Sequence, residues 1–208
     1  MLHIKRRLAE QVDRPSSGVW GWLVLRLMSV RNRPMNEWVI ALLDIQPSDR
    51  VLEIGFGAGL WVERAARLAS AGLVAGIDHS EDMVKLAAKR NRAAVRAGCV
   101  DLRHGDVMAL PYADETFDKA FAVGLIYYLP EPAAALREIR RVLRPGGKLV
   151  LGVRAREAIS QNPVLQVREI RTYAPDDLLA LLREAGFSEA RIEKDPPDAT
   201  VIGATGIK

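Results

Sequence analysis

The sequence predicts an α/β protein with a doubly wound, mostly parallel sheet of seven strands. We expect an antiparallel hairpin at its C-terminal edge and helices on both faces. From residue 50 onward, short apolar runs alternate with helical patterns of about ten residues or more, which is typical of βαβ units. The first run ends in a glycine-rich turn, the position at which such sheets bind ligands. The last two runs are joined only by residues 194–199, too few for a crossover helix, so they should pair antiparallel.

Each element follows from its local pattern. The expected strands are apolar runs bounded by turn residues, at 50–54, 73–77, 100–104, 117–123, 148–153, 187–193 and 200–205. The expected helices have apolar residues at helical spacing, at 19–30, 35–43, 60–70, 81–97, 132–143 and 176–185. Ser80 is the expected N-cap of the helix that follows it, and Pro145-Gly146-Gly147 should end the helix before the fifth strand.

Composition indicates one globular domain without a membrane span. The chain has 208 residues, of which 49% are hydrophobic and 27% charged, enough for a sizeable core. Its one cysteine, Cys99, cannot form an internal disulfide, which favours a reducing compartment. No apolar stretch approaches the roughly 20 residues that a bilayer span needs, and the N-terminus does not resemble a signal peptide. We therefore expect a cytoplasmic protein.

Basic residues are concentrated in residues 1–33. Seven Lys or Arg and two acidic residues give this segment +5, so the remainder of the chain, with a total of +4, carries −1. A basic arm can bind nucleic acid, an anionic membrane surface or an acidic substrate. No RNA-binding signature or row of stacking aromatics accompanies it. We favour a solvated amphipathic helix and expect neither a nucleic-acid partner nor stable membrane insertion.

Residues 51–59, VLEIGFGAG, place an acid, Glu53, inside an apolar run and then Gly55, Gly57 and Gly59 on one turn. Glycine admits positive φ and has no Cβ to hold a ligand away from the backbone. The pattern indicates a cofactor that lies against main chain, near the free N–H groups of a helix. A dinucleotide site would have its third glycine where Leu60 stands, which weakens the alternative of an NAD-type oxidoreductase.

Further segments follow the glycine motif in chain order. They are GIDHS at 76–80, GDVMALPY at 105–112, Phe117-Asp118 with YYLP at 127–130, and LRPGG at 143–147. Together with the glycine motif they resemble the class I S-adenosylmethionine-dependent methyltransferases, in particular the small-molecule methyltransferase group. The resemblance covers residues 50–208 and implies a Rossmann-like fold and a transferase whose cofactor is S-adenosylmethionine and whose cofactor product is S-adenosylhomocysteine.

The resemblance also implies roles for individual residues. Asp78 would accept the ribose hydroxyls, and Asp106 the adenine amino group. The three glycines would admit the methionine portion, with Glu53 ordering that loop or a water near the amino group. The full set of expected cofactor-binding residues is Glu53, Gly55, Phe56, Gly57, Gly59, Asp78, His79, Met83, Asp106, Val107 and Val123. The alternatives are purely structural: a helix-terminal charge for Asp78, a buried acid that caps backbone for Glu53, and core packing for Met83.

Tyr127 and Tyr128 are the candidate catalytic residues, at a position where many members of the family carry two histidines. A tyrosine with the ordinary pKa of ~10 is a poor base at neutral pH. These two side chains are therefore expected to orient the acceptor or line its pocket, and plain aromatic packing is the alternative. No spacing of His, Cys and carboxylates predicts a metal site.

We expect one structural domain in two parts. Residues 1–46 would form a helical arm or lid that contributes to the acceptor pocket together with residues 154–174, and residues 47–208 the methyltransferase domain. The expected reaction is in-line methyl transfer to O, N or C of a small-molecule acceptor, driven mainly by proximity and desolvation. Besides the oxidoreductase, the remaining alternative is a non-catalytic S-adenosylmethionine-binding partner. The protein could be a monomer or a homodimer.

Overall fold

The computed structural model describes residues 32–156, 159, 171–193 and 196–208. Within them, seven strands form one sheet in the order β3-β2-β1-β4-β5-β7-β6. The strands are β1 (Arg50–Ile54), β2 (Leu73–Asp78), β3 (Val100–His104), β4 (Phe117–Val123), β5 (Leu143–Arg154), β6 (Ser188–Ile192) and β7 (Val201–Ile207). The helices are α3 (Arg33–Leu43), α4 (Leu60–Leu68), α5 (Glu81–Arg90), α6 (Arg92–Arg96), the 3-10 turn η1 (Ile126–Tyr128), α7 (Pro132–Val142) and α9 (Pro175–Glu184).

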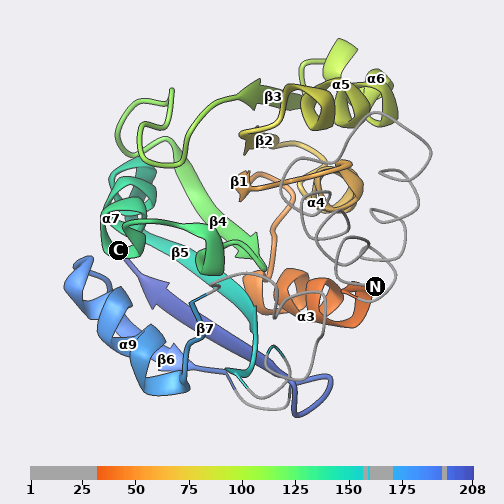
Figure 1. Ribbon diagram of the computed structural model, residues 1–208. Helices are drawn as coiled ribbons and strands as arrows, with labels where there is room; N and C mark the ends of the chain where they lie inside the picture. The colour runs from red at the N-terminus through yellow and green to blue at the C-terminus, as the bar shows by residue number, and fades with distance from the viewer. Residues whose placement is uncertain (1–31, 157–158, 160–170, 194–195) are drawn as a thin grey trace, which may run out of the picture.

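The sheet has the predicted mixture of strand directions. Strands β1 to β5 pair in parallel, whereas β7 runs antiparallel to both of its neighbours, β5 and β6. The prediction of a mostly parallel sheet with antiparallel C-terminal strands is confirmed. The last strand of the sequence lies inside the sheet, and β6 forms the edge (Figure 1).

Alternating side chains on the strands supply a core on each face of the sheet. On one face, Leu52 of β1 belongs to the same buried cluster as Leu178 of α9 and the inner side of α7. On the other face, Val51 shares a cluster with Leu43 of α3 and Val62 of α4. Figure 1 shows the two sets of helices on opposite sides of the strands. The doubly wound architecture therefore leaves the carboxyl ends of the parallel strands available for a ligand.

Helix α3 is part of one of these layers. Its residues Met35, Val39 and Leu43 are at most 1% exposed. The Trp38 ring lies over β7, where a Cβ added to Gly203 would come within 2.6 Å of it. The predicted arm therefore ends in a helix that packs on the sheet. Residues 1–31, with the predicted helix 19–30, lie outside the described residues, and the division into arm and domain stays a prediction.

The predicted helix at 81–97 is interrupted at Asn91. The Asn91 side-chain amide donates hydrogen bonds to the carbonyl of Ala87 at 2.9 Å and to that of Gly59 at 3.0 Å. Such a side chain offers the backbone a local alternative to continued helix, so α5 ends and α6 begins at this residue. The predicted N-cap of α5 is confirmed, because Ser80 Oγ accepts a hydrogen bond from the Met83 N–H at 3.4 Å.

The fifth strand starts earlier than predicted. Leu143 already pairs with Phe117, and the register then shifts before Lys148 pairs with Lys119. Pro145-Gly146-Gly147 forms the irregularity between these pairs, with a φ of 76° at Gly146, a conformation that glycine adopts without strain. These residues follow the end of α7, as expected, but the strand pairing continues across them.

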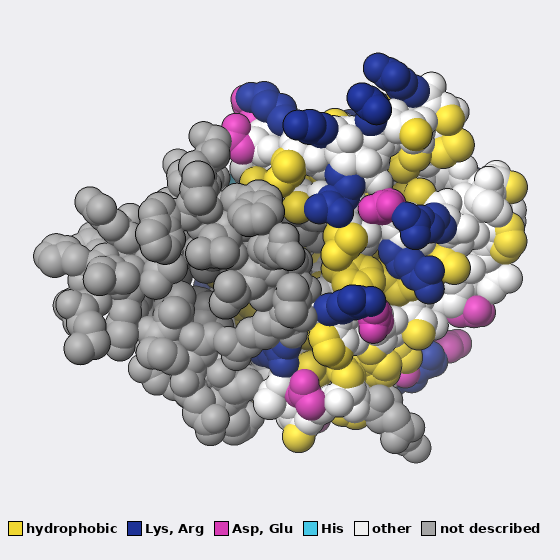
Figure 2. Space-filling model, turned by 90° about the vertical axis from the view of Figure 1, so that its right-hand side faces the viewer, with side chains coloured by type: hydrophobic (Ala, Val, Ile, Leu, Met, Phe, Trp, Pro, Cys, Tyr) yellow, Lys and Arg dark blue, Asp and Glu magenta, His cyan; other side chains and the backbone are white. Residues whose placement is uncertain are grey.

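The surface formed by α3 to α6 carries both signs of charge. Figure 2 shows Lys and Arg side chains among acidic and hydrophobic ones on this face. Ion pairs one helical turn apart join Arg33 to Glu37 at 2.8 Å and Arg67 to Glu63 at 2.5 Å. Exposed pairs of this kind add little stability. The paired charges neutralise one another, but helices α3 to α6 together carry eight Lys or Arg and four Asp or Glu, so basic residues predominate in this layer.

Close approach of α4 to α5 should make Gly59 intolerant of a side chain. Gly59 has a φ of 72°, and an added Cβ would lie 2.6 Å from the Ala87 Cβ. Gly98 is the matched control, since its φ is 74° and no described atom lies within 4 Å of its Cβ position. Gly98→Ala should cost only the left-handed strain, about 1–2 kcal/mol, and Gly59→Ala a further ~1–3 kcal/mol for overpacking. Urea unfolding measures both losses, and equal losses would contradict the packing argument.

Candidate functional site

The carboxyl ends of β1 to β4 form one edge of the sheet, and the strand order reverses between β1 and β4. Backbone hydrogen bonds continue the ladder beyond the strands. The Gly55 N–H donates to the Ile77 carbonyl at 2.8 Å, and the Gly105 N–H to the Asp78 carbonyl at 3.0 Å. Open α/β sheets bind ligands at such a switch point. The glycine loop, Asp78 and the loop that carries Asp106 are therefore neighbours at this edge.

The glycine loop has the backbone conformation that its sequence predicts. Gly55, Gly57 and Gly59 all have positive φ, at 73°, 52° and 72°. A Cβ on Gly57 would meet no described atom within 4 Å, whereas one on Gly55 would touch the Leu125 side chain at 3.4 Å. The loop thus has one side packed against the turn after β4 and a stretch around Gly57 that offers bare backbone to a ligand.

Asp78, at the end of β2, is tied to the glycine loop. Its Oδ2 accepts a hydrogen bond from the Gly57 N–H at 2.8 Å, and its Oδ1 accepts one from the Ser80 N–H at 2.9 Å. The side chain is only 6% exposed. Each carboxylate oxygen has about two acceptor positions, so each keeps one for the hydroxyls of a sugar. Asp78 can therefore order the loop and bind a diol at the same time.

Glu53 is buried beneath this loop, and its carboxyl group is not fully hydrogen-bonded by the described residues. It is 5% exposed, and its Oε2 has no hydrogen-bond partner among the described residues. Burial, and secondarily the charge of Asp78, raise the pKa of Glu53 well above its usual value of 4.5. A buried carboxyl with an unmatched oxygen is stabilised by a cation or a donor. The amino group of a bound amino acid moiety would supply both.

The loop after β3 presents Asp106 in a turn. Asp106 Oδ1 accepts a hydrogen bond from the Met108 N–H at 2.9 Å, and its carbonyl accepts one from the Ala109 N–H at 3.1 Å. The next residue, Val107, is 7% exposed and packs in the core. An exposed carboxylate held in this way can accept a hydrogen bond from an amino group.

The remaining predicted cofactor residues lie around the same edge. Met83 is 6% exposed in the first turn of α5, and Val123 is half-buried at the end of β4. His79 is exposed, with Nδ1 3.6 Å from Asp78 Oδ1. The Phe56 side chain is buried in the core and packs over Gly76. Only the backbone of Phe56 remains to face a ligand.

The two candidate catalytic tyrosines lie in η1, directly after β4. The Tyr127 hydroxyl accepts a hydrogen bond from the Arg154 backbone N–H, and the ring is 9% exposed. Burial raises the pKa of Tyr127, so its phenol stays neutral at physiological pH. Tyr128 is 38% exposed and meets the Tyr127 ring edge-on at a centroid distance of 5.9 Å. This geometry suits orientation of an acceptor by Tyr128 better than proton abstraction by Tyr127.

Sequence reasoning missed the residues that hold the glycine loop from behind. Arg90 Nε donates to the Ala58 carbonyl at 2.9 Å, and Asn91 Nδ2 to the Gly59 carbonyl at 3.0 Å. Both come from the end of α5, far from the loop in sequence. The only local signal was a buried polar residue inside a helical pattern, which does not say what it contacts.

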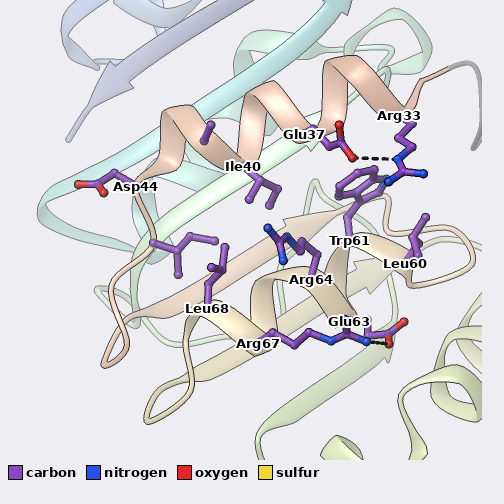
Figure 3. Close-up of a pocket in the computed structure, with 12 residues that line it drawn as sticks. Arg33, Glu37, Ile40, Asp44, Leu60, Trp61, Glu63, Arg64, Arg67 and Leu68 are labelled. Atoms are coloured by element: carbon purple, nitrogen blue, oxygen red, sulfur yellow. Dashed lines mark hydrogen bonds and ion pairs between the residues drawn. The ribbon is translucent and has the colours of Figure 1, made fainter.

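A groove of about 870 Å³ lies between α3 and α4, away from the predicted cofactor residues. Figure 3 shows Ile40 of α3 and Trp61 and Leu68 of α4 beside it, with Arg33 and Glu37 joined at one end. None of the 12 described residues that line it is a predicted cofactor-binding or catalytic residue, although those from α3 and the turn after it belong to the segment 1–46 that we expect at the acceptor pocket. The groove size alone therefore does not identify the cofactor site.

Two further findings concern metals and membranes. Within the described ranges, no group of three His, Cys, Asp or Glu side chains could hold a metal ion. In the same part of the chain, no helix has the length and apolar character needed to cross a bilayer.

Comparison with known proteins agrees with this geometry. The family described as "Methyltransferase domain" matches residues 52–151. The uncharacterized methyltransferase YdaC of Bacillus subtilis (strain 168) is 33% identical over 132 residues, which cover 64% of this chain and 71% of that protein. The chain belongs to the class I S-adenosylmethionine-dependent methyltransferases. The predicted family and its cofactor, S-adenosylmethionine, are thereby confirmed.

Two other similarities extend this assignment. The 27-O-demethylrifamycin SV methyltransferase of Amycolatopsis mediterranei (strain S699) is 33% identical over 169 residues, 76% of this methyltransferase and 61% of that one. The crystal structure of an S-adenosylmethionine-dependent methyltransferase from Aquifex aeolicus has a TM-score of 0.73 at 21% identity, covering 88% of this chain and 96% of the other, and shows the fold. The chain spans between 48% and 71% of the length of four curated relatives.

The raised pKa of Glu53 predicts a pH-dependent stability. In the folded protein, the Glu53 carboxyl keeps its proton at pH values where the same group in the unfolded chain, with the usual pKa of 4.5, has released it. Stability from this group is therefore fully present below pH 4.5 and is lost as the pH rises through the folded pKa. Glu53→Gln should remove this loss. Its advantage over wild type should grow by about 1.4 kcal/mol per pH unit across that interval.

Urea unfolding of the ligand-free protein between pH 4.5 and 8 measures this difference. Glu37→Gln is the control, because Glu37 is an exposed partner of Arg33 on α3. The Glu37→Gln variant should show no advantage over wild type that grows as the pH rises. The same result for Glu53→Gln would mean that Glu53 is not buried in the way described.

Proposed function

We propose that the protein transfers the methyl group of S-adenosylmethionine to a small-molecule acceptor. The observation that carries the proposal is the hydrogen bond from the Gly57 N–H to Asp78, which joins a glycine-rich loop to a carboxylate that has free acceptor positions. The names of relatives support a small acceptor, since one acts on 27-O-demethylrifamycin SV and another, from Aspergillus nomiae, is an O-methyltransferase. Oxygen is therefore the first acceptor atom to test.

The residues present fit the cofactor. Asp78 would hold the ribose, Asp106 the adenine amino group beside Val107 and Met83, and the Gly55–Gly59 loop the methionine portion. The unmatched Oε2 of Glu53 would receive the cationic amino group, which would return that carboxyl to its charged form. His79, Val123 and the Phe56 backbone complete the proposed contacts. When bound, the cofactor supplies a methyl group on a sulfonium, whose leaving group is neutral.

The chain itself contributes alignment more than proton transfer. Holding two reactants in line can supply about 7–11 kcal/mol of the barrier in favourable cases. Tyr128, exposed beside the end of β4, would orient the acceptor, while Tyr127 supports it by edge-on ring contact. The neutral phenol of Tyr127 makes a general-base role unsuitable at physiological pH. An acceptor oxygen that is already ionised, or that loses its proton only late in the transfer, matches this site best.

We further propose that residues 1–46 and 154–174 wall the acceptor side. The described portions are consistent with this, since Arg154 Nη1 donates to Thr200 Oγ1 at 2.6 Å and Nη2 to Asn32 Oδ1 at 3.4 Å. These contacts bring the start of α3 to the carboxyl end of β5. A cytoplasmic location and a monomeric or homodimeric state remain predictions, as does the lack of a nucleic-acid partner.

Loss of the Asp78 charge should weaken cofactor binding. Asp78→Asn replaces one acceptor oxygen by a donor and should raise the Kd for S-adenosylmethionine about ten- to hundredfold. Asp82→Asn, on the exposed first turn of α5, is the control and should bind like wild type. Calorimetry measures both, and wild type should show no comparable binding of NAD. Unchanged affinity of Asp78→Asn would remove the ribose assignment, and preferential binding of NAD would favour the oxidoreductase.

Turnover distinguishes an enzyme from a non-catalytic binding partner. Incubation with methyl-labelled S-adenosylmethionine and a set of phenols, other hydroxylated small molecules and amines should yield a labelled small product and S-adenosylhomocysteine. Asp78→Asn at the same subsaturating cofactor concentration should lower the rate in proportion to its affinity. Tight binding of the cofactor, with no labelled product from any acceptor or metabolite extract, would favour the non-catalytic alternative.

A further inference from the structure

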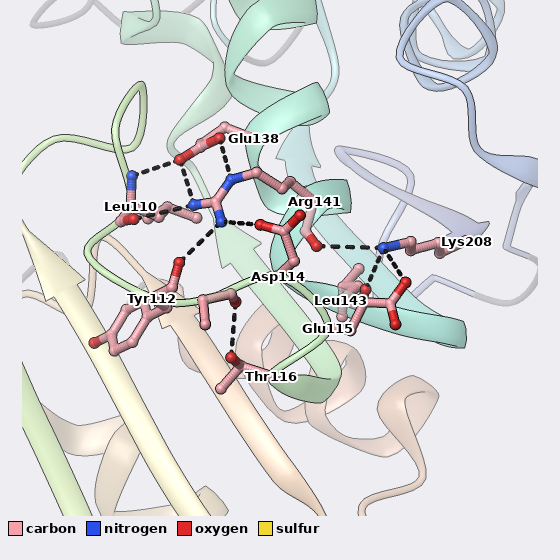
Figure 4. A network of polar contacts seen from close by, with 10 residues as sticks. Leu110, Tyr112, Asp114, Glu115, Thr116, Glu138, Arg141, Leu143 and Lys208 are labelled. Atoms are coloured by element: carbon pink, nitrogen blue, oxygen red, sulfur yellow. Dashed lines mark hydrogen bonds and ion pairs between the residues drawn. The ribbon is translucent and has the colours of Figure 1, made fainter.

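The loop after β3, residues 105–116, is anchored from outside the cofactor site by α7. Its first part carries Asp106 and Val107, and its last part leads into β4. Figure 4 shows the side chains of α7 that reach this loop, together with Lys208 at its far end. These residues lie behind the loop, so their contacts decide where the loop stands without touching a ligand there.

Arg141 makes most of these contacts. Its Nη1 donates to the Tyr112 carbonyl at 2.9 Å and to Asp114 Oδ1 at 2.6 Å, and its Nη2 donates to the Leu110 carbonyl at 3.1 Å. Glu138, one turn earlier on α7, accepts from Arg141 Nη2 at 2.7 Å and from Nε at 2.8 Å. The same carboxylate accepts the Leu110 N–H at 2.8 Å. Leu110 is thus held through both its carbonyl and its N–H.

Glu138 and Arg141 form an ion pair in which each side chain orients the other. The hydrogen bonds from Arg141 hold the pKa of Glu138 below its usual value, against the effect of burial. A guanidinium offers a planar fork of donors that a lysine cannot reproduce. Arg141 therefore joins three loop groups and one helix carboxylate in a single fixed arrangement.

The anchor lies next to the turn that presents Asp106. In that turn the N–H groups of Met108 and Ala109 donate hydrogen bonds to Asp106, and Leu110 is the next residue in the chain. At the other end of the loop, the Glu115 N–H donates to the Arg141 carbonyl at 3.1 Å. Lys208 Nζ donates to the same carbonyl at 3.2 Å. Displacement of Leu110 would release the turn and with it the Asp106 carboxylate.

We propose that Glu138 and Arg141 form a positioning unit for the adenine end of the cofactor site. The inference rests on the proposed function, in which Asp106 accepts the adenine amino group. The unit does not contact the cofactor. It fixes the loop so that binding does not have to order it, and it thereby sets how well the site distinguishes an amino group from a carbonyl on the purine ring.

Calorimetry tests this role by comparing two ligands. One is S-adenosylhomocysteine, and the other is its deaminated analogue, which has a ring carbonyl in place of the amino group. Wild type should prefer the amino form by about tenfold or more. Arg141→Ala should bind S-adenosylhomocysteine about tenfold more weakly and lose most of that preference. Arg141→Lys should restore little, and Glu138→Gln, which keeps an acceptor for Leu110, should fall between Arg141→Ala and wild type. Arg137→Ala, whose partner on the surface is Glu184 at 3.7 Å, is the matched control and should behave as wild type.

Hydrogen exchange of the ligand-free variants gives a second readout. Peptides that cover residues 105–116 should exchange faster in Arg141→Ala and Glu138→Gln, while those from β1 and β2 should not. If Arg141→Ala does not fold, Glu138→Gln must show both effects. Full purine preference and unchanged exchange in a folded variant would overturn the inference. Failure of wild type to bind S-adenosylhomocysteine would instead overturn the proposed function, and the exchange data would still report on the anchor.

Discussion

The hydrogen bond between the Gly57 N–H and Asp78 Oδ2 is the contact on which the site depends. It joins the turn after β1 to the end of β2, two segments that are 21 residues apart. The bond forms because parallel pairing of β1 and β2 brings their carboxyl ends together, and because glycine lets the backbone N–H point back toward the neighbouring strand. The same side chain thus orders the glycine loop and keeps acceptor positions for a ligand.

The loops of the site are supported from outside it. Arg90 and Asn91 hold the carbonyls of the glycine loop, and Glu138 with Arg141 holds the loop after β3. In both cases a polar side chain at the end of a helix binds backbone groups that would otherwise need water. Such support costs side-chain entropy once, during folding, and lowers the entropy that ligand binding has to overcome.

Much of the fold could be predicted because its signals are local. The alternation of apolar runs and helical patterns gave β1, β3 and β4 their bounds, and Ser80 marked the start of α5. The glycine motif and Asp78 were recognisable because they match, in residue type and spacing, the pattern of the family that the sequence resembles. What could not be predicted depends on distant contacts. Asn91 breaks a helix because Gly59 lies beside it, and β5 extends to Leu143 because Phe117 is its partner. The direction of the Phe56 ring follows from the space over Gly76, which sequence pattern does not reveal.

The position of β7 has a consequence for how the protein is made. This strand pairs with β5 along residues 148–154 and also with β6, although residues 201–207 are synthesised after both of these partners. Until residues 201–207 have been synthesised, β5 has only β4 beside it, and its other edge exposes unpaired backbone groups. One edge of β5 therefore stays unpaired while residues 155–200 are being synthesised, and such an edge can pair with another chain.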